Sequence, residues 1–133
     1  MRTYLFIALG GGLGSVLRYW LSTFVDGRLG GAFPWGTLVV NVTGSFVIGF
    51  IATATGTEGR WLAPIAARQF LMVGICGGYT TFSSFSLQTL RLLEDGQWGR
   101  AGANCAASVV LCMLAVAAGH WGALYLSNNP SSR

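Results

Sequence analysis

The residues of this sequence that could do chemistry are uncharged hydrogen-bonding groups and phenyl rings within long apolar stretches. Thr37 and Asn41 lie four residues apart, so they would share one face of a helix, and Ser108 lies in a later apolar stretch. Phe82 and Phe85 lie three residues apart, with hydroxyl side chains between them, and would also share a face. These groups could either hold helices together through polar contacts or line a narrow pore.

Such a lining would favour small anions. Amide N–H and hydroxyl O–H groups donate hydrogen bonds, and the edge of a phenyl ring carries positive partial charge. Uncharged donors can replace part of an anion's hydration shell and still let the ion leave, which conduction requires. Polar contacts between membrane helices, the alternative role, contribute only about 0.6 kcal/mol each. The residue types alone therefore leave a small-anion channel and a packing motif both open.

The ionisable and sulfur-containing side chains argue against several other functions. The four acids, Asp26, Glu58, Glu94 and Asp95, fall in polar connectors or at the ends of apolar stretches, whereas a proton-coupled transporter usually has a carboxylate within the membrane. The single histidine, His120, cannot form a bis-histidine haem site within one chain and is interpreted as a helix-end or interface residue. The three cysteines lack the spacing of metal ligands. Because no nucleophile lies near a plausible base in the sequence, we expect no enzymatic activity.

The composition places most of the chain in lipid. Of the 133 residues, 53% are hydrophobic and 9% are charged, and the mean hydropathy is +0.58. A soluble domain carries roughly 25% charged residues, because it must keep its surface hydrated. The eight basic residues are scattered arginines without a basic run, so we expect no nucleic acid partner. The sequence therefore predicts an all-α membrane protein in contact with lipid.

Four apolar stretches are long enough to cross the membrane, which takes about 20 helical residues. The predicted transmembrane helices cover residues 3–24, 35–55, 62–93 and 101–126. Residues 1–126 would form one four-helix transmembrane domain, and residues 127–133 a polar C-terminal tail. The first stretch could instead be a signal peptide. However, Arg18-Tyr19-Trp20 follows its apolar run in place of small residues at a cleavage site, which favours a retained helix.

The third stretch is too long for one straight helix and contains its own interruption. Its centre reads Gly77-Gly78-Tyr79-Thr80-Thr81, and each glycine costs roughly 1 kcal/mol relative to alanine in a helix. We therefore expect a helix broken near mid-membrane. Backbone groups freed by the break cannot face lipid, so they must be buried in protein or meet water or an ion. A glycine kink that serves only packing is the alternative.

The first stretch contains a glycine run at residues 10–14 that suits close helix packing. A dinucleotide-binding loop would need a β-strand before it, and the sequence predicts no strand there. Gly10 and Gly14, or Gly11 and Ser15, would place small residues one turn apart, so that another helix can approach closely.

The arginines give no clear membrane orientation. With four spans, both termini and the second connector share one side, and the count of arginines is four on each side. The two sets are Arg2, Arg60, Arg68 and Arg133 on one side, and Arg18, Arg28, Arg91 and Arg100 on the other. Orientation follows an excess of positive charge on the cytoplasmic side, and there is none here. The chain could insert both ways and pair with an inverted copy, unless eight arginines are too few for the rule to apply.

Three motifs, in order along the chain, resemble those of the bacterial fluoride channel family. They are the run 10–15 with Arg18-Tyr19, the stretch 36–41 with Gly44, and the stretch 77–86 (Gly-Gly-Tyr-Thr-Thr-Phe-Ser-Ser-Phe-Ser). The resemblance covers nearly the whole chain. It implies a fluoride-specific channel in the cell (inner) membrane, through which fluoride leaves the cytoplasm passively. It also implies an antiparallel, dual-topology homodimer with a structural sodium ion at its centre that is not transported.

The resemblance also implies a role for individual residues. Phe82 and Phe85 would face fluoride in the pore, and Asn41 would donate to it or orient a phenyl ring. Thr37 and Ser108 would line the same path. The remaining residues are Arg18, toward the vestibule or bracing a helix end, and Gly77 and Thr80, whose backbone carbonyls from both subunits would bind sodium.

The sequence departs from the family pattern in the fourth stretch. Asn104 stands where several members have a tyrosine, and Cys112 stands where a serine is expected. Two rival functions also stay open. One is a membrane anchor or assembly subunit that transports nothing, in which the polar faces are only interfaces. The other is a small four-helix drug exporter, which would need a glutamate within the membrane.

Overall fold

The computed structural model describes residues 1–56, 59, 61 and 63–128, and the regular structure within these ranges is helical. The predicted start of the third span at Leu62, the tail residues 129–133, and Glu58 and Arg60 lie outside the described residues. In chain order the elements are α1 (Arg2–Leu29), α2 (Trp35–Ala54), α3 (Ile65–Gln69), the π-helical η1 (Phe70–Cys76), α4 (Gly77–Tyr79), α5 (Phe82–Glu94) and α6 (Trp98–Asn128).

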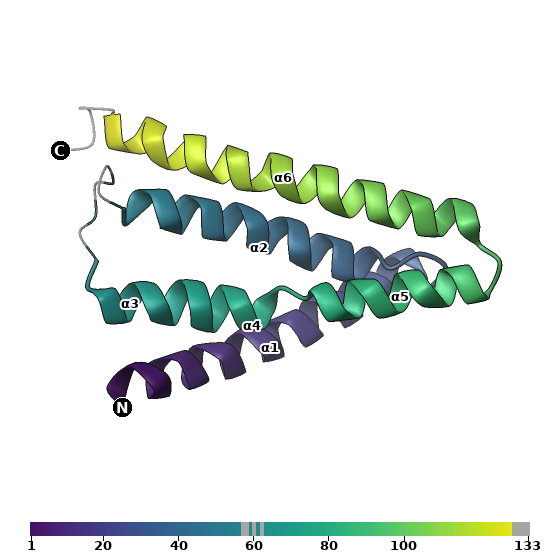
Figure 1. Cartoon of the computed structure of the whole chain (residues 1–133), viewed down its shortest axis with the longest axis horizontal. Helices are drawn as coiled ribbons and strands as arrows, with labels where there is room; N and C mark the ends of the chain where they lie inside the picture. The colour runs from purple at the N-terminus through teal and green to yellow at the C-terminus, as the bar shows by residue number, and fades with distance from the viewer. Residues whose placement is uncertain (57–58, 60, 62, 129–133) are drawn as a thin grey trace.

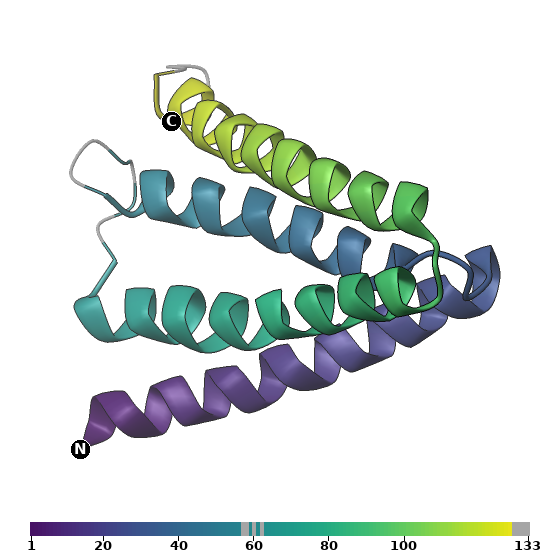
Figure 2. The same ribbon diagram turned by 45° about the vertical axis from the view of Figure 1, so that its right-hand side comes forward.

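Four helical rods are long and apolar enough to cross a membrane, as the sequence predicted: α1, α2, the run Ile65–Glu94 from α3 to α5, and α6. We call the run Ile65–Glu94 the third rod. Helix α2 lies between α6 and the third rod. Helix α1 packs against η1 and α4 on the other side of that rod, and then crosses behind α5 toward the start of α2 (Figures 1 and 2). The start of α1 and the end of α6 lie at the same end of the bundle (Figure 1). About a third (33%) of the most apolar part of α2 is buried, against 11% for α1 and α6, so α2 is the central helix.

Two helices extend beyond their predicted ends. Helix α1 continues past residue 24 to Leu29 and ends at Gly30, whose φ of 84° is one that glycine adopts readily and whose N–H bonds the Asp26 carbonyl. Helix α6 begins at Trp98 and includes Asn128. Apolar composition marks the part of a helix that meets lipid, but the backbone hydrogen bonds continue into the polar flanks until a residue such as Gly30 ends them.

The third rod is interrupted near its middle, as expected. Its hydrogen bonding widens to a π-helix over Phe70–Cys76, and α4 follows for one short turn. Thr80 (ψ 156°) and Thr81 (φ −151°, ψ 112°) are then extended, and α5 begins at Phe82. π-Helical segments are rare and occur often at functional sites. The break lies beside α2 and α1 within the bundle (Figure 1).

Helix α1 packs against the third rod through the glycines that the sequence singled out. Gly10 and Gly14 are buried, and a Cβ atom on Gly14 would overlap the carbonyl oxygen of Ile75. Gly78 has no room for a side chain because the Gly11 backbone lies directly against it. Gly10 and Gly14 therefore make the close contact with η1 and the start of α4, whereas Gly11 and Ser15 meet α4 at Gly78, where it is Gly78 that has no room for a side chain.

Helices α2 and α6 run in the same direction and pack side by side through similar close contacts (Figure 1). A Cβ atom on Gly119 of α6 would overlap the Phe46 carbonyl oxygen of α2. Near the end of the same pair, His120 Nδ1 lies 2.6 Å from the Thr53 hydroxyl. His120 therefore contacts a neighbouring helix, in agreement with its interpretation as an interface residue.

The glycine contact of α1 predicts a position-specific effect on stability. Replacing Gly14 with alanine should lower the thermal unfolding midpoint in detergent, because overpacking a close contact costs about 1–3 kcal/mol. The matched control is Gly12→Ala two residues away on α1, where a Cβ atom meets nothing within 4 Å. Equal unfolding midpoints for the two variants would contradict the close packing of α1 on η1.

Candidate functional site

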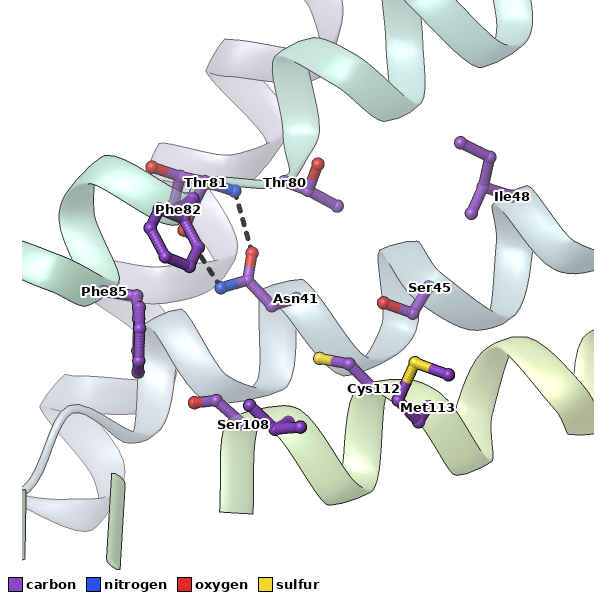
Figure 3. A pocket seen from close by; sticks show the side chains of 11 residues that line it. Asn41, Ser45, Ile48, Thr80, Thr81, Phe82, Phe85, Ser108, Cys112 and Met113 are labelled. Carbon is purple, nitrogen blue, oxygen red and sulfur yellow. Dashed lines mark hydrogen bonds between the residues drawn. The ribbon is translucent and has the colours of Figure 1, made fainter. Parts of the chain in front are cut away.

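The break in the third rod is held by a pair of hydrogen bonds to one side chain of α2. The Thr81 backbone N–H donates to Asn41 Oδ1 at 2.8 Å, and Asn41 Nδ2 donates back to the Thr81 carbonyl oxygen at 3.0 Å (Figure 3). In a continuous helix the Thr81 N–H would instead bond the carbonyl of Gly77, four residues earlier. The Asn41 amide therefore takes over the bond that would otherwise carry the helix through residue 81.

The two threonines at the break stabilise the helix ends on either side of it. Thr81 is the N-cap of α5, since its Oγ1 accepts the Ser84 backbone N–H at 3.1 Å. Thr80 uses both its hydroxyl and its backbone N–H to donate to the Cys76 carbonyl oxygen, each at 2.9 Å. The sequence thus ends one helix and starts the next with adjacent hydroxyl residues, and the extended backbone between them is well bonded.

A cavity of about 400 Å³ lies on one side of the break, and we call it the phenylalanine cavity. Phe82 and Phe85 line it from α5, with ring centroids 5.3 Å apart and ring planes at 50°. Asn41 lines it from α2 and Ser108 from α6 (Figure 3). The other lining residues are Ser45, Ile48, Thr80, Thr81, Val109, Cys112 and Met113. No side chain that lines this cavity carries a formal charge.

The phenylalanine cavity is open at the surface of the single chain. The side chain of Phe82 is 78% exposed, although it lies beside a helix break that should avoid lipid. Phe85 is half-buried, and Ser108 is only 9% exposed. The cavity is therefore closed at Ser108 and open at Phe82, and Val109 and Met113 of α6 are also exposed at its edge.

A second cavity, of about 260 Å³, lies on the other side of the break and is polar. We call it the polar cavity. Its lining residues are Ser15, Arg18, Tyr19, Ser22, Asp26, Thr37, Thr81, Ser84 and Gln88. Thr81 lines both cavities, so its hydrogen bonds to Asn41 lie at the junction between them.

The structure divides the predicted site residues between these two cavities. Asn41, Phe82, Phe85 and Ser108 are brought together in the phenylalanine cavity. Thr37 was predicted to line the same path as Ser108, but it lines the polar cavity together with Arg18. Both cavities end at Thr81, so the two groups are neighbours along one possible route.

Gly77 and Thr80, whose backbone carbonyls were predicted to bind sodium, lie at the break. Thr80 is half-buried and lines the phenylalanine cavity, whereas Gly77 is exposed at the surface of the single chain. The Gly77 carbonyl is released from its usual helical bond because Thr81 donates to Asn41 instead.

Asn104 lies one turn before Ser108 on α6 but does not face the phenylalanine cavity with it. It is 2% exposed and absent from the lining of the phenylalanine cavity. Its Nδ2 donates to Thr89 Oγ1 at 2.9 Å, and Thr89 donates to the Phe85 carbonyl oxygen at 2.8 Å. Asn104 therefore ties α6 to α5, because α5 crosses α6 at this level and covers that side of it.

Two residues of the polar cavity, Asp26 and Gln88, were not predicted as site residues. Asp26 was assigned to the polar connector after the first span, but it lies within α1. Its Oδ1 accepts the Gly36 backbone N–H at 2.7 Å, which joins α1 to the start of α2. Gln88 continues the α5 face of Thr81 and Ser84, at intervals of three and four residues. That periodicity could have placed Gln88 beside Thr81, whereas nothing in the sequence relates Asp26 to Gly36.

Comparison with known proteins gives one consistent family. Residues 5–120 match the family model of the CrcB-like proteins, described as camphor resistance proteins. The fluoride-specific ion channel FluC of Opitutus terrae is 60% identical over 128 residues, which cover 96% of this chain and 97% of the relative. The FluC protein of Rhodospirillum rubrum is 59% identical over 125 residues, covering 94% and 97%. That of Methylocella silvestris is 56% identical over 117 residues, covering 88% and 89%.

The paired hydrogen bonds at the break predict that Asn41→Ala destabilises the fold. It would leave the buried Thr81 N–H without its acceptor, at a cost of about 1–3 kcal/mol. Thermal unfolding in detergent and hydrogen exchange at the Thr81 amide would measure the effect. The matched control is Ser45→Ala, one turn further along α2 and facing the same cavity. The assignment is wrong if Thr81 exchanges no faster in Asn41→Ala than in Ser45→Ala.

Proposed function

This chain belongs to the CrcB-like family, and from that premise we propose that it is a fluoride-specific ion channel through which fluoride leaves the cell passively. It is a membrane protein and no enzyme is found among the relatives described above. The observation that carries the proposal is the meeting of two cavities at Thr81, one polar and charged, the other lined by phenyl rings and uncharged donors.

The polar cavity would receive the ion with part of its water. Arg18 supplies positive charge there, and the hydroxyl groups of Thr37 and Ser22 can donate to an anion or to its hydration shell. The N-terminus of α5 lies at the same junction, and the positive end of a helix dipole favours negative charge. An anion is therefore attracted toward Thr81 before it loses water.

The phenylalanine cavity would replace the water that the ion gives up. The Ser108 hydroxyl can donate, and the Asn41 amide has a second N–H besides the one bonded to Thr81. The tilted rings of Phe82 and Phe85 can present positive edges to an anion. Because no lining group carries a full charge, the ion is bound weakly enough to leave.

Asn41 would act mainly as a positioning residue in this scheme. Its two bonds hold the backbone of Thr81, the residue directly before Phe82. Fixing that backbone fixes the direction in which α5 starts and therefore the placement of the Phe82 ring. This supports the second of the two roles predicted for Asn41, the orientation of a phenyl ring.

The functional unit would be an antiparallel, dual-topology homodimer. Phe82 is 78% exposed in the single chain, so a second copy would be needed to close the open wall of the phenylalanine cavity. The arginines give no preference for one orientation in the membrane, which is consistent with insertion both ways round. An inverted partner would bring the break of its own third rod against this one.

A sodium ion would fit between two such breaks. Hard cations prefer oxygen ligands, and the Gly77 and Thr80 carbonyls lie where the helical bonding is interrupted. Gly77 is exposed, and a Cβ atom there would meet only the Met72 carbonyl oxygen at 3.7 Å, so its surroundings have room for a partner. The ion would supply positive charge that holds the carbonyls of both copies together, without taking part in transport.

The rival functions account for fewer of these features. A drug exporter would need a carboxylate among the apolar helices, whereas the described acids Asp26, Glu94 and Asp95 lie toward the end of the bundle that holds the α1–α2 and α5–α6 connectors. A membrane anchor would explain polar contacts between helices such as Asn104 with Thr89. It gives no reason for two cavities to meet at a bonded helix break.

Fluoride efflux from liposomes tests the proposed channel directly. Vesicles that contain the purified protein should release fluoride on dilution far faster than empty vesicles. Phe82→Ile should slow that release by several-fold to about tenfold, because a ring-edge interaction contributes about 0.5–1.5 kcal/mol. The matched control is Phe6→Ile, whose ring packs edge-to-face on Phe70 away from both cavities. Release equal to that of empty vesicles would favour the anchor, and equal rates for the two variants would remove Phe82 from the pore.

The proposed sodium site predicts a cation-dependent stability. Dialysis from sodium into N-methylglucamine should lower both the thermal unfolding midpoint and the fraction of dimer in detergent, because a large organic cation cannot be held by backbone carbonyls. Returning the protein to sodium should restore both values. An unchanged midpoint after complete exchange, checked by sodium analysis of the sample, would show that Gly77 and Thr80 do not bind the ion.

A further inference from the structure

A third cavity extends the polar cavity toward the end of the bundle. It measures about 330 Å³ and lies between the α1–α2 connector and the end of α5, with Phe33 and Pro34 on one side and Arg91 and Asp95 on the other. Asp26 and Gln88 line both this cavity and the polar cavity. The two cavities therefore adjoin at Asp26 and Gln88, and we call them together the route from the connectors to Thr81.

Charges of both signs line this route. Arg18 of α1 and Arg91 of α5 are basic, while Asp26 of α1 and Asp95 after α5 are acidic. The formal charges therefore cancel, two against two. A route for anions would attract them more strongly without the acids, so the presence of a carboxylate where its two cavities meet needs an explanation.

Asp26 is held in place and cannot turn its charge away from the route. Its Oδ1 accepts the Gly36 N–H at 2.7 Å, and Gly36 is buried. A Cβ atom on Gly36 would lie 2.7 Å from Asp26 Oδ2, so the carboxylate fills the space that a side chain would need. Asp26 itself is half-buried, which reduces the screening of its charge by solvent.

The surroundings of Asp26 are polar enough to hold water. The Oε1 atom of Gln88 is buried and has no hydrogen-bond partner among the described residues. Buried polar atoms of this kind are normally satisfied by water or by a ligand. An ion at this point is therefore hydrated, and it responds to the charge of Asp26 through space.

We propose that Asp26 limits how long anions stay in the polar cavity. Its fixed negative charge offsets the attraction of Arg18, so that fluoride is admitted from the connectors but is not held tightly before it reaches Thr81. The hydrogen bond to Gly36 positions that charge. The inference rests on the proposed channel function and assigns Asp26 as a residue that determines conduction.

A variant that removes the charge of Asp26 but keeps its hydrogen bond to Gly36 distinguishes an effect on anions from helix capping. In Asp26→Asn the amide oxygen can still accept the Gly36 N–H, because asparagine caps helices as well as aspartate does. The matched control is Glu94→Gln, which removes one negative charge at the same end of the bundle from a residue that lines none of these cavities. Fluoride efflux from liposomes is measured for wild type and both variants at low ionic strength and again with added impermeant salt.

The expected result is a change that depends on charge and is screened by salt. At low ionic strength Asp26→Asn should change the fluoride concentration at half-maximal flux, lowering it by about two- to fivefold relative to wild type. The difference should fade in high salt, and Glu94→Gln should match wild type throughout. The inference is overturned if the half-maximal concentration of Asp26→Asn equals that of Glu94→Gln, or if it shifts equally at both ionic strengths. Asp26 would then serve only as a helix cap.

A second variant keeps the test decisive if Asp26→Asn does not fold. Arg91→Gln removes a positive charge from the outer cavity without touching the Asp26 bond to Gly36, and it should raise the half-maximal concentration with the same salt dependence. An unchanged value for Arg91→Gln would show that ions do not use this route. Failure of the channel proposal itself is separate, since wild-type protein would then release fluoride no faster than empty vesicles.

Discussion

The structure at the centre of this molecule depends on one backbone N–H group that bonds a side chain in place of its usual helical carbonyl. Because the Thr81 N–H donates to Asn41 and not to the Gly77 carbonyl, the third rod stops and α5 begins afresh at Phe82. The same exchange leaves carbonyl groups available at the break and puts a helix N-terminus beside the two cavities. A broken helix in lipid is costly unless its backbone groups are satisfied. Here one asparagine side chain satisfies both the donor and the acceptor of the same residue.

The break also depends on how closely α1 can approach it. Gly10 and Gly14 of α1, together with Gly78 of α4, let the α1 backbone lie directly against η1 and α4. Ser15 donates to the Gly78 carbonyl oxygen at 3.4 Å, so α1 contributes to the satisfaction of the break as well. Larger residues at the glycine positions would move α1 outward, and with it the side chains of α1 that line the polar cavity.

Full charges and uncharged donors are kept apart along the proposed route. Arg18, Asp26 and Arg91 line the cavities nearer the connectors, where water can screen them. Beyond Thr81 the lining consists of hydroxyl, amide, thiol and phenyl groups with aliphatic side chains. A full charge in that apolar region would bind an oppositely charged ion tightly or require a buried partner. The separation allows attraction at the entrance and weak, multiple contacts in the interior.

The sequence by itself determined the helical class, the four spans and the interruption of the third span. These features depend on local properties: the length of an apolar stretch, such as residues 3–24, and the glycine content of a short segment, such as residues 74–81. It also predicted Asn41, Phe82, Phe85 and Ser108 as site residues, because their types stand out in apolar surroundings, and the four line one cavity. Only the tertiary structure decided that Thr37 and Arg18 share a different cavity, that Asn104 serves α5, and that Asp26 caps α2 at Gly36. These relations join different helices, and helical spacing gives the face of a residue without specifying which helix that face will meet.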